Sequence, residues 1–152
     1  MNVQISNRQS SVTIDTSHFK RLTEQMLGDL EMTDAEISVI FVDSPTIADL
    51  HLRFMQESGA TDIITFPLSE PGDHPLEGEL VICAPWAAEV AQRNGDSVTD
   101  ELVLYLAHGL IHLTGQDDIQ PEDAEEMRKR EHKLLSSLNL VIPRNRFESI
   151  EG

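Results

Sequence analysis

Residues 99–118, TDELVLYLAHGLIHLTGQDD, decide how the rest of the chain is interpreted. The stretch is apolar on most sides of a helical projection, which is typical of a helix in the centre of a fold. His108 and His112 are four residues apart, so they lie one turn apart on the same helical face. The pattern H-x3-H-x2-G-x2-D predicts a buried helix with Thr99 as N-cap, a stop at Gly115, and Asp118 beyond the turn.

The histidine pair indicates a metal site. Two imidazoles on an apolar helix are costly to bury unless they find partners, and one metal ion is a partner for both. A histidine pair of this spacing can bind one ion, and a turn at Gly115 can bring Asp118 back as a third ligand. The spacing is short enough to arise by chance, so it leaves open that both are ordinary core histidines. The isolated histidines receive that simpler interpretation: His18, His74 and His132.

Gly109 restricts the chemistry of such a site. The helical zinc-peptidase signature places a glutamate directly after the first histidine, where it acts as the general base. Glycine has no side chain in this place. We therefore do not expect peptide hydrolysis by that mechanism.

Composition favours one globular domain. The chain has 152 residues, of which 39% are hydrophobic and 25% charged. We expect residues 1–152 to form a single domain, with 139–152 as a partly ordered tail. No apolar run has the length of a membrane span, no signal peptide is recognisable, and Cys83 is the only cysteine. These features predict a cytoplasmic protein without an intrachain disulfide.

The charge is strongly acidic, with a formal net value of -16 from 27 acidic and 11 basic residues. This argues against broad electrostatic attraction to nucleic acid or to an anionic membrane, and it leaves room for a local basic groove. The basic residues near the C-terminus are candidates to meet an RNA backbone, and a solvated helix face is the other interpretation of them. They are Arg128, Lys129, Arg130, Lys133, Arg144 and Arg146.

Strand and helix patterns are mixed along the chain, which predicts an α+β domain. We expect a small mixed β-sheet packed with helices around the central metal-binding helix. The predicted strands are 3–5, 12–14, 37–42, 63–66 and 79–83, and 68–78 is a predicted loop. The predicted helices are 18–30 (capped by Thr16 or Ser17), 45–56, 85–94, the histidine helix and 121–138. In the second helix, Ile47, Leu50, Phe54 and Met55 are predicted to point inward.

Three motifs then carry a resemblance to a known family. Residues 108–118, HGLIHLTGQDD, resemble the signature HGxLHLxGYDH of the YbeY family of bacterial rRNA maturation endoribonucleases. Residues 61–67, TDIITFP, are similar to the family's T-[DN]-V-L-S-F-P, and 78–83, GELVIC, to its G-D-[IL]-V-I-C. Residues 122–127, EDAEEM, resemble the acidic helix start that follows the signature. Order and spacing agree from about residue 36 to 138, which is most of the chain.

The resemblance implies a single-domain α+β fold and a zinc ion (Zn2+) held by His108, His112 and Asp118. It implies a cytoplasmic hydrolase that cuts RNA in rRNA processing, ribosome maturation and quality control. The implied partners are rRNA precursors and the small ribosomal subunit, with no role at membranes or on DNA. One alternative is a zinc-containing ribosome-assembly or RNA-binding factor with little or no nuclease activity. Another is a metallohydrolase of small substrates.

The third ligand position departs from the family. Asp118 stands where the family has its last histidine, and a carboxylate is an acceptable zinc ligand. The carboxylate adds a negative charge, which could admit other divalent metals that favour oxygen. Asp117 occupies the family's aspartate position and is the competing ligand. The alignment favours Asp118, with Asp117 as an acceptor for the N–H of a ligand histidine.

The second departure lies in the helix of residues 45–56. The family has an asparagine and, four residues later, a cleft arginine thought to contact RNA or the reacting phosphate. His51 and Met55 stand in those places. Met55 cannot stabilise phosphate charge, and Arg53 is two residues away and faces elsewhere on a helix. His51 could replace part of the polarity, so it joins His108, His112 and Asp118 as a candidate catalytic residue. The other interpretation of His51 is an ordinary surface histidine.

The mechanism that we expect is metal-assisted phosphodiester hydrolysis, in which the ion activates water and polarises a phosphoryl oxygen. If the 2′-hydroxyl of the RNA attacks instead, the metal has only an electrostatic role. No residue of the sequence stands out as the general acid or base.

Overall fold

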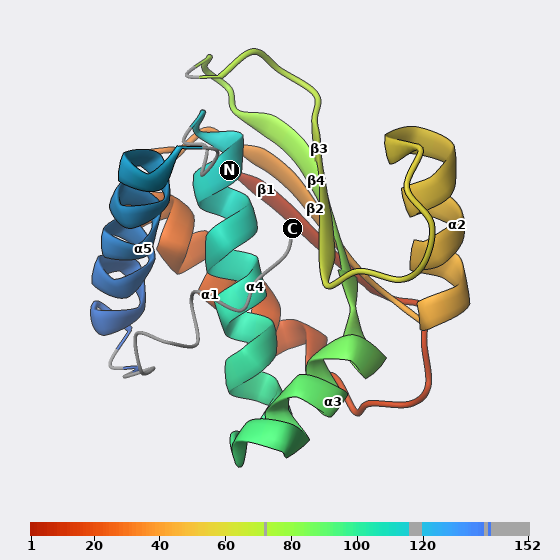
Figure 1. Ribbon diagram of the computed structural model, residues 1–152. Helices are drawn as coiled ribbons and strands as arrows, with labels where there is room; N and C mark the ends of the chain where they lie inside the picture. The colour runs from red at the N-terminus through yellow and green to blue at the C-terminus, as the bar shows by residue number, and fades with distance from the viewer. Residues whose placement is uncertain (72, 116–119, 139, 141–152) are drawn as a thin grey trace.

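A four-stranded mixed sheet forms the middle of the computed structural model, which describes residues 1–71, 73–115, 120–138 and 140 (Figure 1). The strands are β1 (Asn2–Asn7), β2 (Glu36–Val42), β3 (Ile63–Pro67) and β4 (Glu77–Cys83), in the order β1-β2-β4-β3. β1, β2 and β4 are parallel neighbours, and β3 runs antiparallel to β4 with Ile63 opposite Ile82. The predicted mixed sheet is confirmed, and β1 and β3 are its edge strands.

The described residues form five helices beside the sheet: α1 (Thr16–Asp29), α2 (Ser44–Met55), α3 (Ala84–Asn94), α4 (Val98–Leu113) and α5 (Pro121–Ser136). α1 and α4 cover one face of the sheet, α5 lies outside them, and α2 lies on the opposite face (Figure 1). The arrangement is the predicted α+β fold. No helix in the described parts of the chain is long and apolar enough to cross a membrane.

Two hydrophobic clusters lie on the two faces of the sheet. The larger one joins the sheet to α1, α4 and α5, and includes the fully buried Met26, Phe41 and Leu80. The smaller one lies under α2 and consists of Val42, Ile47, Ile64, Val81 and Cys83. The central strands are therefore covered on both sides, which explains the unbroken apolar run of residues 39–42.

α4 is the central helix, as predicted. Every residue from Glu101 to Leu113 is buried except His112. The helix lies so close to β3 and β4 that a Cβ atom on Gly109 would lie 2.8 Å from Ile63 Cδ1 and 2.9 Å from Leu80 Cδ2. A glutamate at this position would have to enter the packed layer between helix and sheet. The close packing of α4 on the sheet therefore leaves no room at position 109 for the glutamate of the peptidase signature.

Two helix starts differ from the predictions. α4 is capped by Ser97, whose hydroxyl accepts from the Asp100 N–H at 3.1 Å, rather than by Thr99. α1 is capped by Asp15, whose carboxylate accepts from the His18 N–H at 3.1 Å, rather than by Thr16 or Ser17. Aspartate, serine and threonine all cap well, so a run of them leaves the first helical residue ambiguous in sequence.

The predicted strand at residues 12–14 is wrong. The Gln9 side chain accepts from the Val12 N–H at 2.9 Å and donates to the Val12 carbonyl oxygen at 2.8 Å. The backbone groups that a strand would offer to a neighbour are used within this turn. β4 also begins at Glu77, two residues before the predicted start, which shortens the predicted loop.

The prediction of which α2 side chains point inward is only partly correct. Ile47 is buried, but Phe54 and Met55 are 57% and 44% exposed. The ring of Phe54 packs edge-on against that of Phe66, with centroids 5.4 Å apart, on the outside of the smaller cluster. A helical stripe predicts which side chains share a face, but the small cluster under α2 is too narrow to cover the whole stripe.

Cys83 provides a first prediction. Its thiol is buried, with Sγ 3.6 Å from the Ser44 hydroxyl oxygen, and burial raises the pKa of the Cys83 thiol. The thiolate is the reactive form, and the raised pKa keeps it unpopulated until the pH rises above the ordinary thiol range. We expect no alkylation by iodoacetamide of the native protein at neutral pH and complete alkylation in urea, measured by mass spectrometry. Equal labelling rates in both conditions would contradict this placement.

Candidate functional site

α4 presents its two histidines side by side. The rings of His108 and His112 lie edge to face, with centroids 4.6 Å apart and planes inclined by 72°. The Nε2 atoms of both rings are shielded from solvent. His108 is only 3% exposed, whereas His112 is partly exposed at the wall of a cleft. The predicted pairing of the two rings on one helical face is therefore present.

A buried glutamate of α5 orients the inner histidine. Glu131 Oε1 lies 2.5 Å from His108 Nδ1, and the two side chains are 1% and 3% exposed. An ionised carboxylate can only accept, so Nδ1 donates, and in the neutral ring Nε2 carries the lone pair. Histidines that bind metal ions commonly donate their other N–H to a carboxylate in this way. The arrangement fits a metal ligand.

The predicted third ligand lies outside the described residues, because these omit both Asp117 and Asp118. Within the described parts of the chain, no group of three His, Cys, Asp or Glu side chains is arranged to hold a metal ion. The turn that leads toward both aspartates is present. Gly115 has φ +101°, and a Cβ atom there would lie 2.9 Å from Pro71 Cβ, so the position requires glycine.

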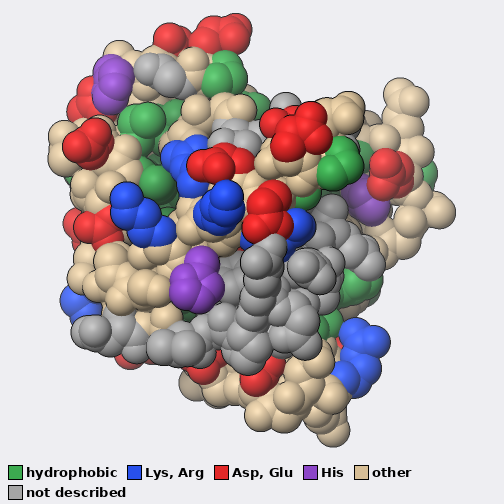
Figure 2. Space-filling model, turned by 60° about the vertical axis from the view of Figure 1, so that its left-hand side comes forward, with side chains coloured by type: hydrophobic (Ala, Val, Ile, Leu, Met, Phe, Trp, Pro, Cys, Tyr) green, Lys and Arg blue, Asp and Glu red, His purple; other side chains and the backbone are tan. Residues whose placement is uncertain are grey.

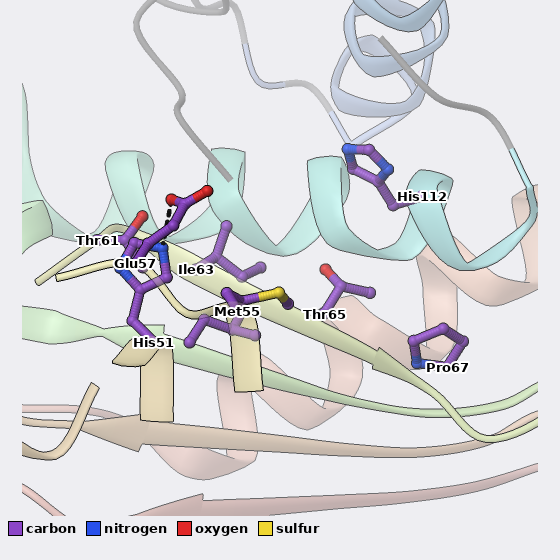
Figure 3. A pocket seen from close by; sticks show the side chains of 9 residues that line it. His51, Met55, Glu57, Thr61, Ile63, Thr65, Pro67 and His112 are labelled. Atoms are coloured by element: carbon purple, nitrogen blue, oxygen red, sulfur yellow. Dashed lines mark ion pairs between the residues drawn. The ribbon is translucent and has the colours of Figure 1, made fainter. Parts of the chain in front are cut away.

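His112 opens onto a cleft of about 400 Å³ that runs along the edge strand β3. α2 and α4 belong to opposite faces of the sheet, and side chains of both helices reach the cleft at this edge (Figure 3). The volume is in the range of sites that hold small ligands or parts of larger ones. The cleft is lined by His51, Met55, Glu57, Thr61, Ile63, Ile64, Thr65, Pro67 and His112.

His51 lies in this cleft, at the end away from His112 (Figure 3). Its Nδ1 is 3.0 Å from the Gly59 carbonyl oxygen, and its Nε2 is 3.0 Å from Glu57 Oε2. The ring is 15% exposed, so it is not an ordinary surface histidine. The structure thus brings His51 and His112 to one cleft, whereas the buried His108 is not among the residues that line it.

The side chains that α2 directs into the cleft include no lysine or arginine. Met55 lines the cleft, while Arg53 extends outward to Asp49 at 3.3 Å, as its helical position predicts. No lysine or arginine is among the described residues that line the cleft.

On the side of the molecule that carries α5, basic side chains are interspersed with acidic ones (Figure 2). Arg128, for example, pairs with Glu125 at 2.8 Å, and both side chains are only partly exposed.

Two residues of the site, Glu131 and Glu57, were not predicted from the sequence. Glu131 lies on the buried stripe of α5 between Met127 and Leu134, at helical spacing, and this acidic residue on an apolar stripe was a usable signal. Glu57 gave no signal, because it follows α2 in an irregular segment and reaches His51 only through the local path of the chain.

Comparison with known proteins assigns the chain to a family. The model of the family described as Endoribonuclease YbeY matches residues 4–139. The Endoribonuclease YbeY of Beutenbergia cavernae is 40% identical over 144 residues, which cover 89% of this chain and 95% of the relative. That of Thermobifida fusca is 37% identical over 148 residues, with 90% and 93% covered.

A solved structure supports the fold independently. The solution structure of the Thermotoga maritima protein TM1509 has a TM-score of 0.62 to this chain at 23% identity, and the match covers 98% of this chain and 97% of that protein. The family match spans the sheet, the histidine helix and α5. The chain therefore belongs to the YbeY family of endoribonucleases.

Proposed function

We propose that this protein is a metal-dependent endoribonuclease that acts in the cytoplasm on rRNA precursors. Its proposed roles are rRNA processing, ribosome maturation and quality control, with the small ribosomal subunit as partner. Membership of the YbeY family over residues 4–139 supports the reaction class. The observation that carries the metal dependence is the Glu131–His108 contact beside His112 at the cleft wall.

The proposed metal ligands are His108, His112 and, by alignment with the family, Asp118. Zinc is the proposed ion, and the carboxylate ligand extends the choice to other divalent metals. When bound, such an ion supplies an acidified water molecule and withdraws electrons from a phosphoryl oxygen. Glu131 holds the His108 ring in place from the protein side. The open edge of β3 gives an RNA strand access to the exposed side of His112.

A second candidate function is an RNA-binding assembly factor that contains zinc and has little nuclease activity. Met55 in the place of the family's cleft arginine favours it, because a thioether cannot stabilise the charge of a reacting phosphate. The two functions differ in one result. An rRNA fragment that is bound but not cut at any metal loading would support the assembly factor.

Alanine substitutions of the two aspartates test the ligand set. We expect Asp118→Ala to lose the bound metal and RNA cleavage, since one of three protein ligands is removed. Asp117→Ala should keep the metal with an affinity lowered by about tenfold, as for the loss of a group that only orients a ligand. Elemental analysis after gentle purification measures the metal, and a labelled rRNA fragment measures cleavage. Loss of metal in Asp117→Ala but not in Asp118→Ala would reverse the assignment.

A further inference from the structure

His51 lies between two hydrogen-bond acceptors. The Gly59 carbonyl oxygen, 3.0 Å from Nδ1, can only accept, so Nδ1 must donate. The Glu57 carboxylate lies 3.0 Å from Nε2, and when ionised it also only accepts. A proton therefore lies between Nε2 and Glu57. An anion that takes the place of the Glu57 carboxylate therefore meets an N–H donor at Nε2.

The surroundings make this N–H donor important for the cleft. No lysine or arginine is among the described residues that line it, and His112, at the other end, is a proposed metal ligand. Met55, one helical turn after His51, adds only a thioether. His51 brings to this lining a ring with acceptor oxygens 3.0 Å from both of its nitrogens.

The two members of the pair differ in how firmly they are held. His51 is 15% exposed and anchored to the backbone at Gly59. Glu57 is 70% exposed and lies in the irregular segment after α2. Ion pairs with an exposed partner contribute little, so a competing anion can displace Glu57 at small cost. The position of the Glu57 oxygen is therefore the position in which an anion would accept a hydrogen bond from His51 Nε2.

We propose that His51 is a phosphate-binding residue of the cleft, and that Glu57 occupies its Nε2–H until a phosphate group of RNA displaces it. The identity of the incoming anion as an RNA phosphodiester rests on the proposed function. The N–H of a charged imidazole and a phosphate oxygen form a charge-assisted hydrogen bond, which is stronger than a neutral one. Glu57 then competes with the substrate for the Nε2–H of His51.

The first experiment measures RNA binding by fluorescence anisotropy, with a labelled rRNA fragment whose integrity is checked on a gel after each titration. We expect His51→Asn to weaken binding by about tenfold, as for the loss of one charged hydrogen bond. Glu57→Gln should tighten binding by about fivefold, because the competing charge is removed. Glu89→Gln, an equal charge change at an exposed site of α3 outside the cleft lining, is the control and should change little.

The double variant separates this account from a general charge effect. In the His51→Asn background, Glu57→Gln should give no further gain, and Met55→Arg should restore binding by placing a cation on the same wall of the cleft. An equal gain from Glu57→Gln in both backgrounds would overturn the proposal, as would wild-type affinity of His51→Asn.

Inorganic phosphate is the second probe and does not depend on RNA as the substrate. The ring resonances of His51 should shift on phosphate addition, at a lower phosphate concentration in Glu57→Gln than in the wild type. Ring resonances that do not respond to phosphate in either protein would overturn the role of His51. A wild-type protein that neither binds nor cuts RNA, but shows this response, would instead overturn the proposed function.

Discussion

Replacing Glu131 with alanine is expected to lower the free energy of unfolding by about 3 kcal/mol, the cost of leaving a buried hydrogen-bond donor without its charged acceptor. Glu131 and His108 are 1% and 3% exposed, so water cannot take the place of the lost carboxylate without opening the contact between α4 and α5. The variant leaves the Nδ1–H of His108 without the acceptor that now lies 2.5 Å away.

The matched variant Glu131→Gln separates packing from electrostatics. Glutamine keeps the side-chain length and an oxygen that accepts from His108 Nδ1, so it should cost much less stability than alanine. The carboxylate charge that strengthens the ligand is lost, and metal affinity should fall by about tenfold or more. Urea unfolding in the presence of chelator measures stability, and competition with a chromophoric chelator measures affinity. Wild-type values of both quantities in Glu131→Ala would contradict the assigned contact.

Replacing Gly109 with leucine is expected to destabilise the protein by about 3 kcal/mol or more, through overpacking between α4 and the sheet. The Cβ atom alone would lie within 3 Å of Ile63 Cδ1 and Leu80 Cδ2, at distances of 2.8 and 2.9 Å. Both neighbours are buried, so neither can turn out to solvent. Any shift of α4 away from β3 also moves His108 and His112, so metal affinity should fall together with stability.

Alanine at the same position is the control. Gly109→Ala adds only the Cβ atom and improves helix propensity by about 1 kcal/mol, which offsets part of the strain. Its loss of stability should therefore be clearly smaller than that of Gly109→Leu. Thermal unfolding of both variants and of the wild type gives the comparison. A leucine variant as stable as the wild type would show that α4 does not approach the sheet so closely.

The features that the sequence predicted correctly are local ones. The run 37–42 is recognisable as a strand because five of its six residues are β-branched or aromatic. α4 is recognisable as a central helix because it is apolar on most sides. The turn at Gly115 was predictable because the residue type itself allows φ +101°. The family motifs add the order of these parts along the chain.

The features that remained hidden depend on how elements meet. His108 and Glu131 are 23 residues apart and come together only because α5 packs on α4. The exposure of Phe54 follows from the narrow cluster under α2, which helical periodicity does not encode. The place of β3 at the sheet edge, which opens the cleft beside His112, is likewise a property of the sheet as a whole.

The most direct test of the account is the metal content of the wild-type protein and of His112→Ala, measured by elemental analysis and paired with cleavage of an rRNA fragment. His112 lies at the cleft wall and is the one residue between Glu101 and Leu113 that is not fully buried, so its replacement by alanine should leave the fold intact. We predict one metal ion per wild-type chain, cleavage that chelator abolishes, and neither metal nor cleavage in the folded variant. A folded His112→Ala protein that retains the metal and cuts RNA at the wild-type rate would contradict the central claim.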